Sequence, residues 1–101
     1  MIIMLKFEWD DNKNQLNIQK HGISFQEAAS VFNDDNTILI FDEIHSEHED
    51  RFLLIGFSYR ANILIVCRCY RNNNSIIKII SARKATKEES KLYLKNYEKR
   101  I

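Results

Sequence analysis

Proline is absent from this sequence of 101 residues, and glycine and cysteine occur only twice each. A chain with no proline and so little glycine is not a linker, a collagen-like repeat or a low-complexity segment. Its hydrophobic content of 45% favours packed secondary structure instead. The length fits a single domain over residues 1–101.

Long hydrophobic runs are also missing. The apolar start, residues 1–5, gives way to charge at Lys6 and is too short for a signal peptide or a membrane span. Cys67 and Cys69 lie two residues apart, which is neither a C-x-x-C pair nor half of a zinc site, so we expect buried, reduced thiols. These absences lead us to expect a cytoplasmic protein with no membrane segment.

Net charge is small for the whole chain, +1, but the two halves carry opposite charges. Residues 1–50 hold three basic and eleven acidic side chains, whereas residues 51–101 hold twelve basic and three acidic side chains. A basic half attracts phosphate backbones at long range. The acidic half either neutralises this charge within the fold or faces a different partner.

Periodicity and capping predict the secondary structure. Ser24 with Glu27 and Thr86 with Glu89 form capping boxes that begin helices, and Gly22 ends an earlier polar helix. The predicted helices are residues 10–20, 24–32 and 86–101, and the predicted strands are residues 5–9, 37–43, 51–59, 63–70 and 75–83. Short turns between the last strands favour an antiparallel arrangement. We therefore expect an α+β fold in the order β-α-α-β-β-β-β-α, with an antiparallel sheet of four to five strands, two N-terminal helices and one C-terminal helix.

Several arginines lie at predicted strand ends. Arg83 and Lys84 come where an apolar strand meets the last helix, and an arginine there can bind phosphate through its guanidinium fork. The alternatives are that Arg83 pairs with an acid from the first half and that Lys84 belongs to a solvated face. Arg71 ends the preceding strand, and Arg68 lies on the opposite face of that strand, so both cannot reach one site. Arg71 is the freer of the two to bind a ligand, or else it is an ordinary exposed turn residue.

Titratable residues gather in the acidic half. Glu49 and Arg51 are two residues apart at the start of a strand, so they share a face, where a carboxylate serves as a general base or orients arginines. Lys20 and His21 end the first helix, where a cationic histidine can also act simply as a cap. Residues 45–50 hold two histidines and three carboxylates, which permits a metal site, although an exposed charged loop is the commoner reason for such spacing.

Four sequence blocks occur in a characteristic order along the chain. They are F-E-W-D at residues 7–10, K-H-G-I-S-F at residues 20–25, E-D-R-F at residues 49–52 and I-S-A-R-K-A at residues 80–85. Together they resemble the BrnT-type toxins of bacterial type II toxin-antitoxin systems. Residues 1–3 extend beyond the usual start of that family, which makes Met4 an alternative initiator.

The resemblance implies a RelE-like fold, RNA cleavage that inhibits translation, and neutralisation by a BrnA-like ribbon-helix-helix antitoxin. It also implies that operator DNA is bound only through the toxin-antitoxin complex. Carried over by motif, the expected catalytic residues are Glu49, Arg71 and Arg83. The residues expected to contact RNA are Lys20, His21, Arg51 and Lys84.

The expected chemistry is attack of a ribose 2′-hydroxyl on its own 3′-phosphate, for which we expect neither a metal ion nor another cofactor. Arg71 and Arg83 would stabilise the phosphorane, and Glu49 or His21 would transfer protons. A non-catalytic binding module and a metal hydrolase that uses His45 and His48 are the rival hypotheses. We expect the antitoxin to cover the basic side and the acidic half to balance the fold.

Overall fold

The structure of the chain is a computed structural model that describes residues 5–99. The strands are β1 (Lys6–Glu8), β2 (Ile38–Phe41), β3 (Arg51–Phe57), β4 (Ile63–Arg71) and β5 (Ile76–Lys84). The helices are α1 (Asp11–His21), α2 (Phe25–Ser30) and α3 (Lys87–Lys99), with a short 3-10 helix, η1 (Val31–Asn33), after α2. This order confirms the predicted α+β class. The alternative initiator Met4 lies outside the described residues.

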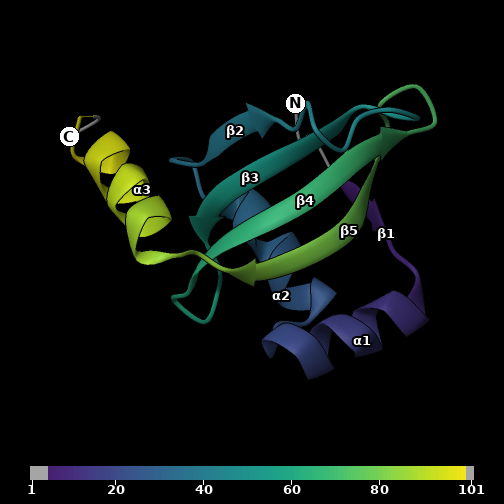
Figure 1. Cartoon of the computed structure of the whole chain (residues 1–101), viewed down its shortest axis with the longest axis horizontal. Coiled ribbons are helices and arrows are strands. Elements are labelled where there is room, and N and C mark those ends of the chain that lie inside the picture. Colours follow the sequence, from purple (N-terminus) through teal and green to yellow (C-terminus); the bar gives the residue numbers. More distant parts are fainter. Residues whose placement is uncertain (1–4, 100–101) are drawn as a thin grey trace.

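The sheet has five strands in the order β1-β5-β4-β3-β2 (Figure 1). Strands β2 to β5 form the predicted antiparallel meander, but β1 pairs parallel to β5. The prediction of a purely antiparallel sheet was therefore wrong at β1. A long crossover connection can place two strands side by side in the same direction, and the connection between β1 and β5 contains most of the chain. The alternation of residues within a strand does not specify this direction.

The helix boundaries follow local capping. Gly22 adopts a left-handed φ of 72° and closes α1 with a backbone bond to the carbonyl of Ile18. The Ser24 hydroxyl accepts a hydrogen bond from the Glu27 N–H at 3.0 Å, as expected at the start of α2. Both bonds of the second capping box are present before α3, from Thr86 N–H to the Glu89 carboxylate and from Glu89 N–H to the Thr86 hydroxyl.

Helix α2 and η1 cover one face of the sheet (Figure 1). Phe25 and Ala28 are fully buried, as predicted, whereas Ala29 and Phe32 are only partly buried and Val31 completes the core in their place. The helix period is broken after Ser30, where the chain tightens into η1. The sheet residues of this core are Leu54, Leu64, Val66, Ile79 and Ala82.

Asn17 joins α1 to the edge of β5. Its buried amide donates to the carbonyls of Ile23 and Ala82, both at 2.8 Å, and accepts from the Ala82 N–H at 3.2 Å. Because β1 pairs only with the first half of β5, this amide takes the place of a neighbouring strand along the second half. The C-terminal end of α1, with Lys20 and His21, is thereby held beside the end of β5.

Helix α3 packs against the other face of the sheet, near the end where β5 finishes (Figure 1). Its buried anchor is Tyr93, which contacts Ile55 and Ile65 and donates a hydrogen bond to the Asp34 carboxylate at 2.6 Å. Neighbouring residues of a strand point to opposite faces, so these isoleucines lie opposite the α2 core. The helix covers only one end of this face.

Candidate active site

A cleft of about 600 Å³ lies on the sheet face that α3 covers only at one end. Its floor includes Leu53 from β3, Ile65 and Cys67 from β4, and Ser81 from β5. The charged and imidazole side chains that line it are Lys20, His21, Asp42, His45, Arg51 and Arg83. The fold thus brings the predicted RNA-binding residues of α1 and β3 together with the predicted catalytic Arg83. Such a cationic hollow can bind a phosphodiester.

A β-bulge decides that Arg83 faces this cleft. In the pairing of β4 with β5, Cys67 lies opposite Ser81 and Arg68 lies opposite Ile79, so β5 carries one extra residue at Ile80. In a regular strand Arg83 would share a face with buried Ile79. The extra residue reverses the alternation and turns Arg83 onto the open face.

Arg83 is held by Glu89, the acid of the second capping box. Its guanidinium donates to both carboxylate oxygens, at 2.7 and 3.0 Å. This charged hydrogen bonding lowers the pKa of Glu89 to about 2 and raises the pKa of Arg83. Arg83 therefore does pair with a carboxylate, but the expected partner from the acidic first half was wrong, because α3 begins immediately beside the end of β5.

Glu49 forms a second charged cluster with two arginines. Its carboxylate lies 3.6 Å from Arg51 and 3.4 Å from Arg71. Arg51 pairs with Cys69 in the sheet register, so Glu49 and Arg71 extend the two strands on the same face. The prediction that Glu49 and Arg51 share a face is confirmed. Arg51 also lines the cleft and so connects this cluster to it.

The two predicted catalytic arginines stand at opposite ends of the face. Arg83 pairs with Ile65, and Arg71 lies six residues further along β4, so their Cα atoms are about 20 Å apart at ~3.3 Å per residue. Each guanidinium has its own carboxylate partner, Glu49 for Arg71 and Glu89 for Arg83. Side chains stand roughly perpendicular to a sheet, so the two guanidinium groups lie over different parts of this face.

Two further basic residues lie outside the cleft: Lys84, which was predicted to bind RNA, and Arg68, which was the alternative to Arg71. Lys84 is exposed at the end of β5 and pairs with Leu64, on the side opposite Arg83. Arg68 is buried beneath η1, with its guanidinium carbon 4.5 Å from the centre of the Tyr70 ring and 5.3 Å from that of Phe32. This position confirms that Arg68 and Arg71 lie on opposite faces.

Asp42 was not among the candidate residues, and His45 was considered only as a metal ligand, yet both line the cleft. The Asp42 carboxylate lies 2.9 Å from Nδ1 of His45. The D-x-x-H spacing was the available indication, but its position in a run of charged residues made it indistinguishable from a solvated loop. Only the closure of this loop over the sheet places the pair beside Arg51.

The two cysteines are free thiols, as expected, but the expected burial holds only for Cys69, because Cys67 is half-buried. Burial raises the pKa of the Cys67 thiol, which lies on the cleft floor and has a hydrogen bond with Ser81. Burial and the nearby Glu49 carboxylate raise the pKa of Cys69. Both sulfurs are therefore neutral near pH 7 and are poor nucleophiles.

The described part of the chain contains no cluster of side chains that would support the hypothesis of a metal site. Within residues 5–99, no group of three or more histidine, cysteine, aspartate and glutamate side chains is placed to hold a metal ion. His45 and His48 do line a neighbouring hollow of about 280 Å³ with Glu47 and Glu49.

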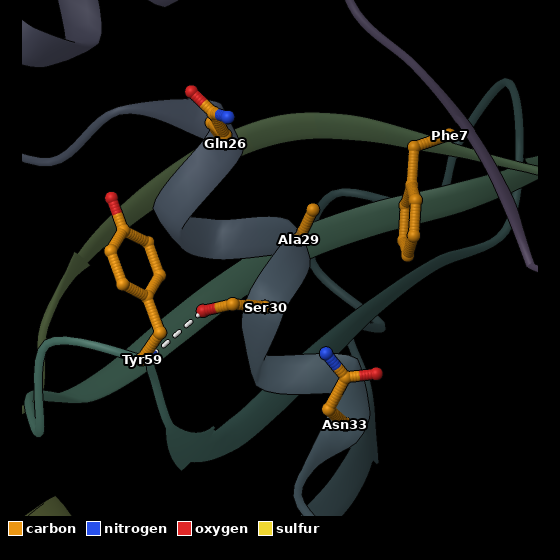
Figure 2. A pocket seen from close by; sticks show the side chains of 6 residues that line it. All are labelled: Phe7, Gln26, Ala29, Ser30, Asn33 and Tyr59. Atoms are coloured by element: carbon orange, nitrogen blue, oxygen red, sulfur yellow. Dashed lines mark hydrogen bonds between the residues drawn. The ribbon is translucent and has the colours of Figure 1, made fainter.

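Another hollow, of about 440 Å³, lies over α2 on the helix-covered side (Figure 2). Figure 2 shows Phe7 and Tyr59 on either side of the helix, with the Tyr59 N–H bound to the Ser30 hydroxyl at 2.9 Å. Its other lining residues are Gln26, Ala29 and Asn33. None of these side chains is charged, so this hollow is less suited to phosphate chemistry than the cationic cleft.

Comparison with known protein families decides the assignment. A family model described as "Ribonuclease toxin, BrnT, of type II toxin-antitoxin system" matches residues 9–89. The chain belongs to the BrnT family. The resemblance read from the four sequence blocks is thereby confirmed. Membership gives the chain ribonuclease toxin activity, with RNA as substrate and an antitoxin as partner.

A solved structure supports the BrnT fold. The crystal structure of the Brucella abortus ribonuclease toxin BrnT, at 1.1 Å resolution, is similar to this chain with a TM-score of 0.63. The alignment covers 83% of this chain and 100% of that chain at 24% sequence identity, so it bears on the fold alone. A comparison with curated proteins gave no match. Within residues 5–99, no helix has the length and apolar content needed to span a membrane.

Proposed function

We propose that this chain is an endoribonuclease that cleaves RNA without a metal ion and thereby inhibits translation. The 2′-hydroxyl oxygen attacks the adjacent phosphorus, which leaves a 2′,3′-cyclic phosphate and a free 5′-hydroxyl. The observation that carries this proposal is the cleft, where Arg51, Arg83 and Lys20 surround a space that also holds imidazole groups. RNA supplies the nucleophile, so the protein needs only charge stabilisation and proton transfer.

The roles follow from position. Arg83, with Arg51 and Lys20, stabilises the charge that develops on the phosphorane, and His21 transfers a proton. To bind Arg83, an RNA phosphate displaces the Glu89 carboxylate, because both groups accept hydrogen bonds from the same guanidinium N–H groups.

The distant cluster acts on the same strand of RNA. Arg71 contacts a second phosphate, and Glu49 orients Arg71 and Arg51, which it approaches to within 3.4 and 3.6 Å. Lys84 contributes to the long-range attraction of RNA from outside the cleft. The Glu49 carboxylate can also accept a proton at its own end of the face, so Glu49 is the alternative to His21 as general base.

The remaining parts of the proposal concern the partner and location. The antitoxin is a BrnA-like ribbon-helix-helix protein that covers the basic side and competes with RNA for the same charges. Operator DNA is bound only by the toxin-antitoxin complex. We also infer that the site of action is the cytoplasm, that the chain needs no cofactor, and that it belongs to the RelE-like superfamily.

Replacing Arg83 tests the proposal. We expect Arg83→Ala to lower the RNA cleavage rate in EDTA by about 100- to 1,000-fold, as for the loss of one preorganised donor to a transition state. Lys95→Ala, which removes a charge from an exposed position on α3, is the matched control and should cleave like the parent. Thermal unfolding of each variant separates loss of activity from loss of fold. Parent-like cleavage and growth arrest by Arg83→Ala would refute the role of Arg83.

A non-catalytic binding module is the second candidate, since the carboxylate partners of Arg51, Arg71 and Arg83 satisfy these charges without any reaction. It predicts RNA binding that weakens with salt and never leads to cleavage. The metal hydrolase predicts that EDTA abolishes cleavage and that divalent metal restores it. Incubation of purified protein with RNA in EDTA and then in Mg²⁺ separates all three functions.

A further inference from the structure

The loop between β2 and β3 holds the Asp42 carboxylate in a fixed place. The Asp42 N–H bonds to the Arg51 carbonyl at 2.9 Å, and the Ser46 hydroxyl donates to the Asp42 carbonyl and accepts from the Arg51 N–H. These bonds close the loop on itself at the start of β3. The Asp42 side chain is only 11% exposed, so its carboxylate has a defined position beside the cleft.

The position of Asp42 orients His45. The carboxylate lies 2.9 Å from Nδ1 of the imidazole, and the His45 side chain is 63% exposed. A carboxylate that accepts the Nδ1–H fixes the tautomer and leaves Nε2 to exchange protons with a ligand. Since both residues line the cleft, a phosphodiester bound there lies beside the imidazole.

His45 and His21 approach the cleft from opposite sides. His21 ends α1, which is held at the β5 edge through Asn17, whereas His45 follows β2, which is the strand beyond β3. The floor between them is made by β5, β4 and β3, so it is two interstrand spacings wide, or about 10 Å. A phosphodiester on this floor would therefore have one imidazole on each side, as in-line displacement requires of its acid and base.

We propose that His45, positioned by Asp42, is a catalytic residue that exchanges a proton with RNA through Nε2, opposite His21. This inference rests on the proposed ribonuclease function. The 2′-oxygen forms a bond to phosphorus while its proton passes to one imidazole. The bond from phosphorus to the 5′-oxygen breaks with its electron pair on oxygen, which takes a proton from the other imidazole. Proton exchange with water then restores both histidines.

The surroundings of His45 suit this step. The other charged and imidazole groups that line the cleft are Lys20, His21, Asp42, Arg51 and Arg83. The three cations stabilise the phosphorane charge, and Asp42 is the one carboxylate among the cleft-lining residues. The neutral Cys67 thiol and the Ser81 hydroxyl form the floor and add no competing charge.

The test compares His45→Ala with His48→Ala, an exposed histidine of the same loop that does not line the cleft. We expect His45→Ala to lower kcat by about 100- to 10,000-fold, the range for loss of a general acid or base, with little change in RNA affinity. His48→Ala should cleave at the parent rate. Free imidazole should restore part of the activity of His45→Ala, and one limb of the parent's pH-rate profile should disappear in this variant.

Asp42→Asn tests the positioning role. The amide keeps the shape of the side chain but no longer favours the Nδ1–H tautomer, so cleavage should fall and the pH-rate profile should shift while RNA affinity stays unchanged. A purely structural role for Asp42 would lower stability without moving the pH profile. This result would overturn the assignment of Asp42 as a positioning residue.

Running each assay in EDTA and in Mg²⁺ separates failure of this inference from failure of the proposed function. A parent protein active only in Mg²⁺ refutes metal independence, and the His45 comparison is then made in Mg²⁺. A parent that binds RNA but cleaves it in neither buffer refutes the enzyme and the inference together. If the parent cleaves, parent-like kcat and pH profile in His45→Ala overturn the inference alone.

Discussion

The contact between Glu89 and Arg83 stabilises the fold but occupies the guanidinium that we propose binds RNA. We therefore expect Glu89→Gln to lower stability and to strengthen RNA binding. The amide can still accept the Thr86 N–H, which Glu89 Oε1 now receives at 2.8 Å, so the helix cap is retained. The change removes the carboxylate charge, and with it one of the two oxygens that bind Arg83.

The lowered pKa of Glu89 sets the size of the effect. A shift from 4.5 to about 2 corresponds to at most ~3 kcal/mol of coupling. The Arg83 side chain is 40% exposed, and solvent screening reduces the contribution to about 1–2 kcal/mol. For a chain of this size, that loss lowers Tm by roughly 5–10 °C at neutral pH.

The sign of the pH dependence follows from the lowered pKa. The folded pKa of Glu89 lies below its ordinary value, so the unfolded chain binds the proton more tightly between these two values. The stabilisation is complete above pH 4.5 and is lost as the pH falls towards about 2. The difference in unfolding free energy between parent and Glu89→Gln should therefore shrink over this interval.

Urea unfolding at several pH values and RNA-binding titrations provide the assay. We expect Glu89→Gln to bind RNA about fivefold more tightly, because ~1 kcal/mol is no longer needed to release the Arg83 guanidinium. Glu88→Gln is the control, since that carboxylate is 85% exposed and lies 3.7 Å from Lys91. A Glu89→Gln variant as stable as the parent at pH 7, or one with weaker RNA binding, would refute this reasoning.

Two substitutions and one alkylation experiment test the fold and the cleft. Asn17→Ala should cost about 2–4 kcal/mol in chemical unfolding, because the edge of β5 at Ala82 loses buried hydrogen bonds; an unchanged midpoint would contradict this. Gly56→Ala should cost about 1–3 kcal/mol, since the new Cβ would lie 2.7 Å from Thr37 Cγ2; parent-like stability would show that the site can relax. Because burial raises the pKa of Cys67, its reactive thiolate forms only at alkaline pH, where bound RNA should slow its alkylation. Equal alkylation rates with and without RNA would show that RNA binds outside this cleft.

Much of the secondary structure could be predicted because its causes are local. The capping boxes and Gly22 depend on residues within one turn of each other, and they correctly predict the end of α1 and the starts of α2 and α3. The end of α2 at Ser30 was not predicted, because no capping glycine marks it. Strand ends were predicted within two residues. Local alternation does not record which way a neighbouring strand runs, which is why the parallel pairing of β1 was missed.

The candidate site was only partly accessible to such reasoning. The sequence blocks indicated Lys20, His21, Arg51 and Arg83, which the fold does gather in one cleft. They did not indicate His45 as a proton-transfer residue. The sequence offered it only as a metal ligand, because its charged loop resembles a solvated segment until it closes against β3. The roles of the residues gathered in the cleft in RNA binding and cleavage remain predictions, as do those of Glu49, Arg71 and Lys84.

The sequence by itself determined the family, the capped helix ends and the basic character of the second half, since each depends on residue identity or on neighbours in the chain. Only the tertiary structure decided which side chains meet. The bulge at Ile80 turns Arg83 towards the cleft, and the start of α3 gives it Glu89 as a partner. Sheet pairing also separates Arg71 from Arg83 by about 20 Å and brings Asp42 with His45 across from His21. These contacts join residues far apart in the chain, and their register depends on the packing of the whole sheet.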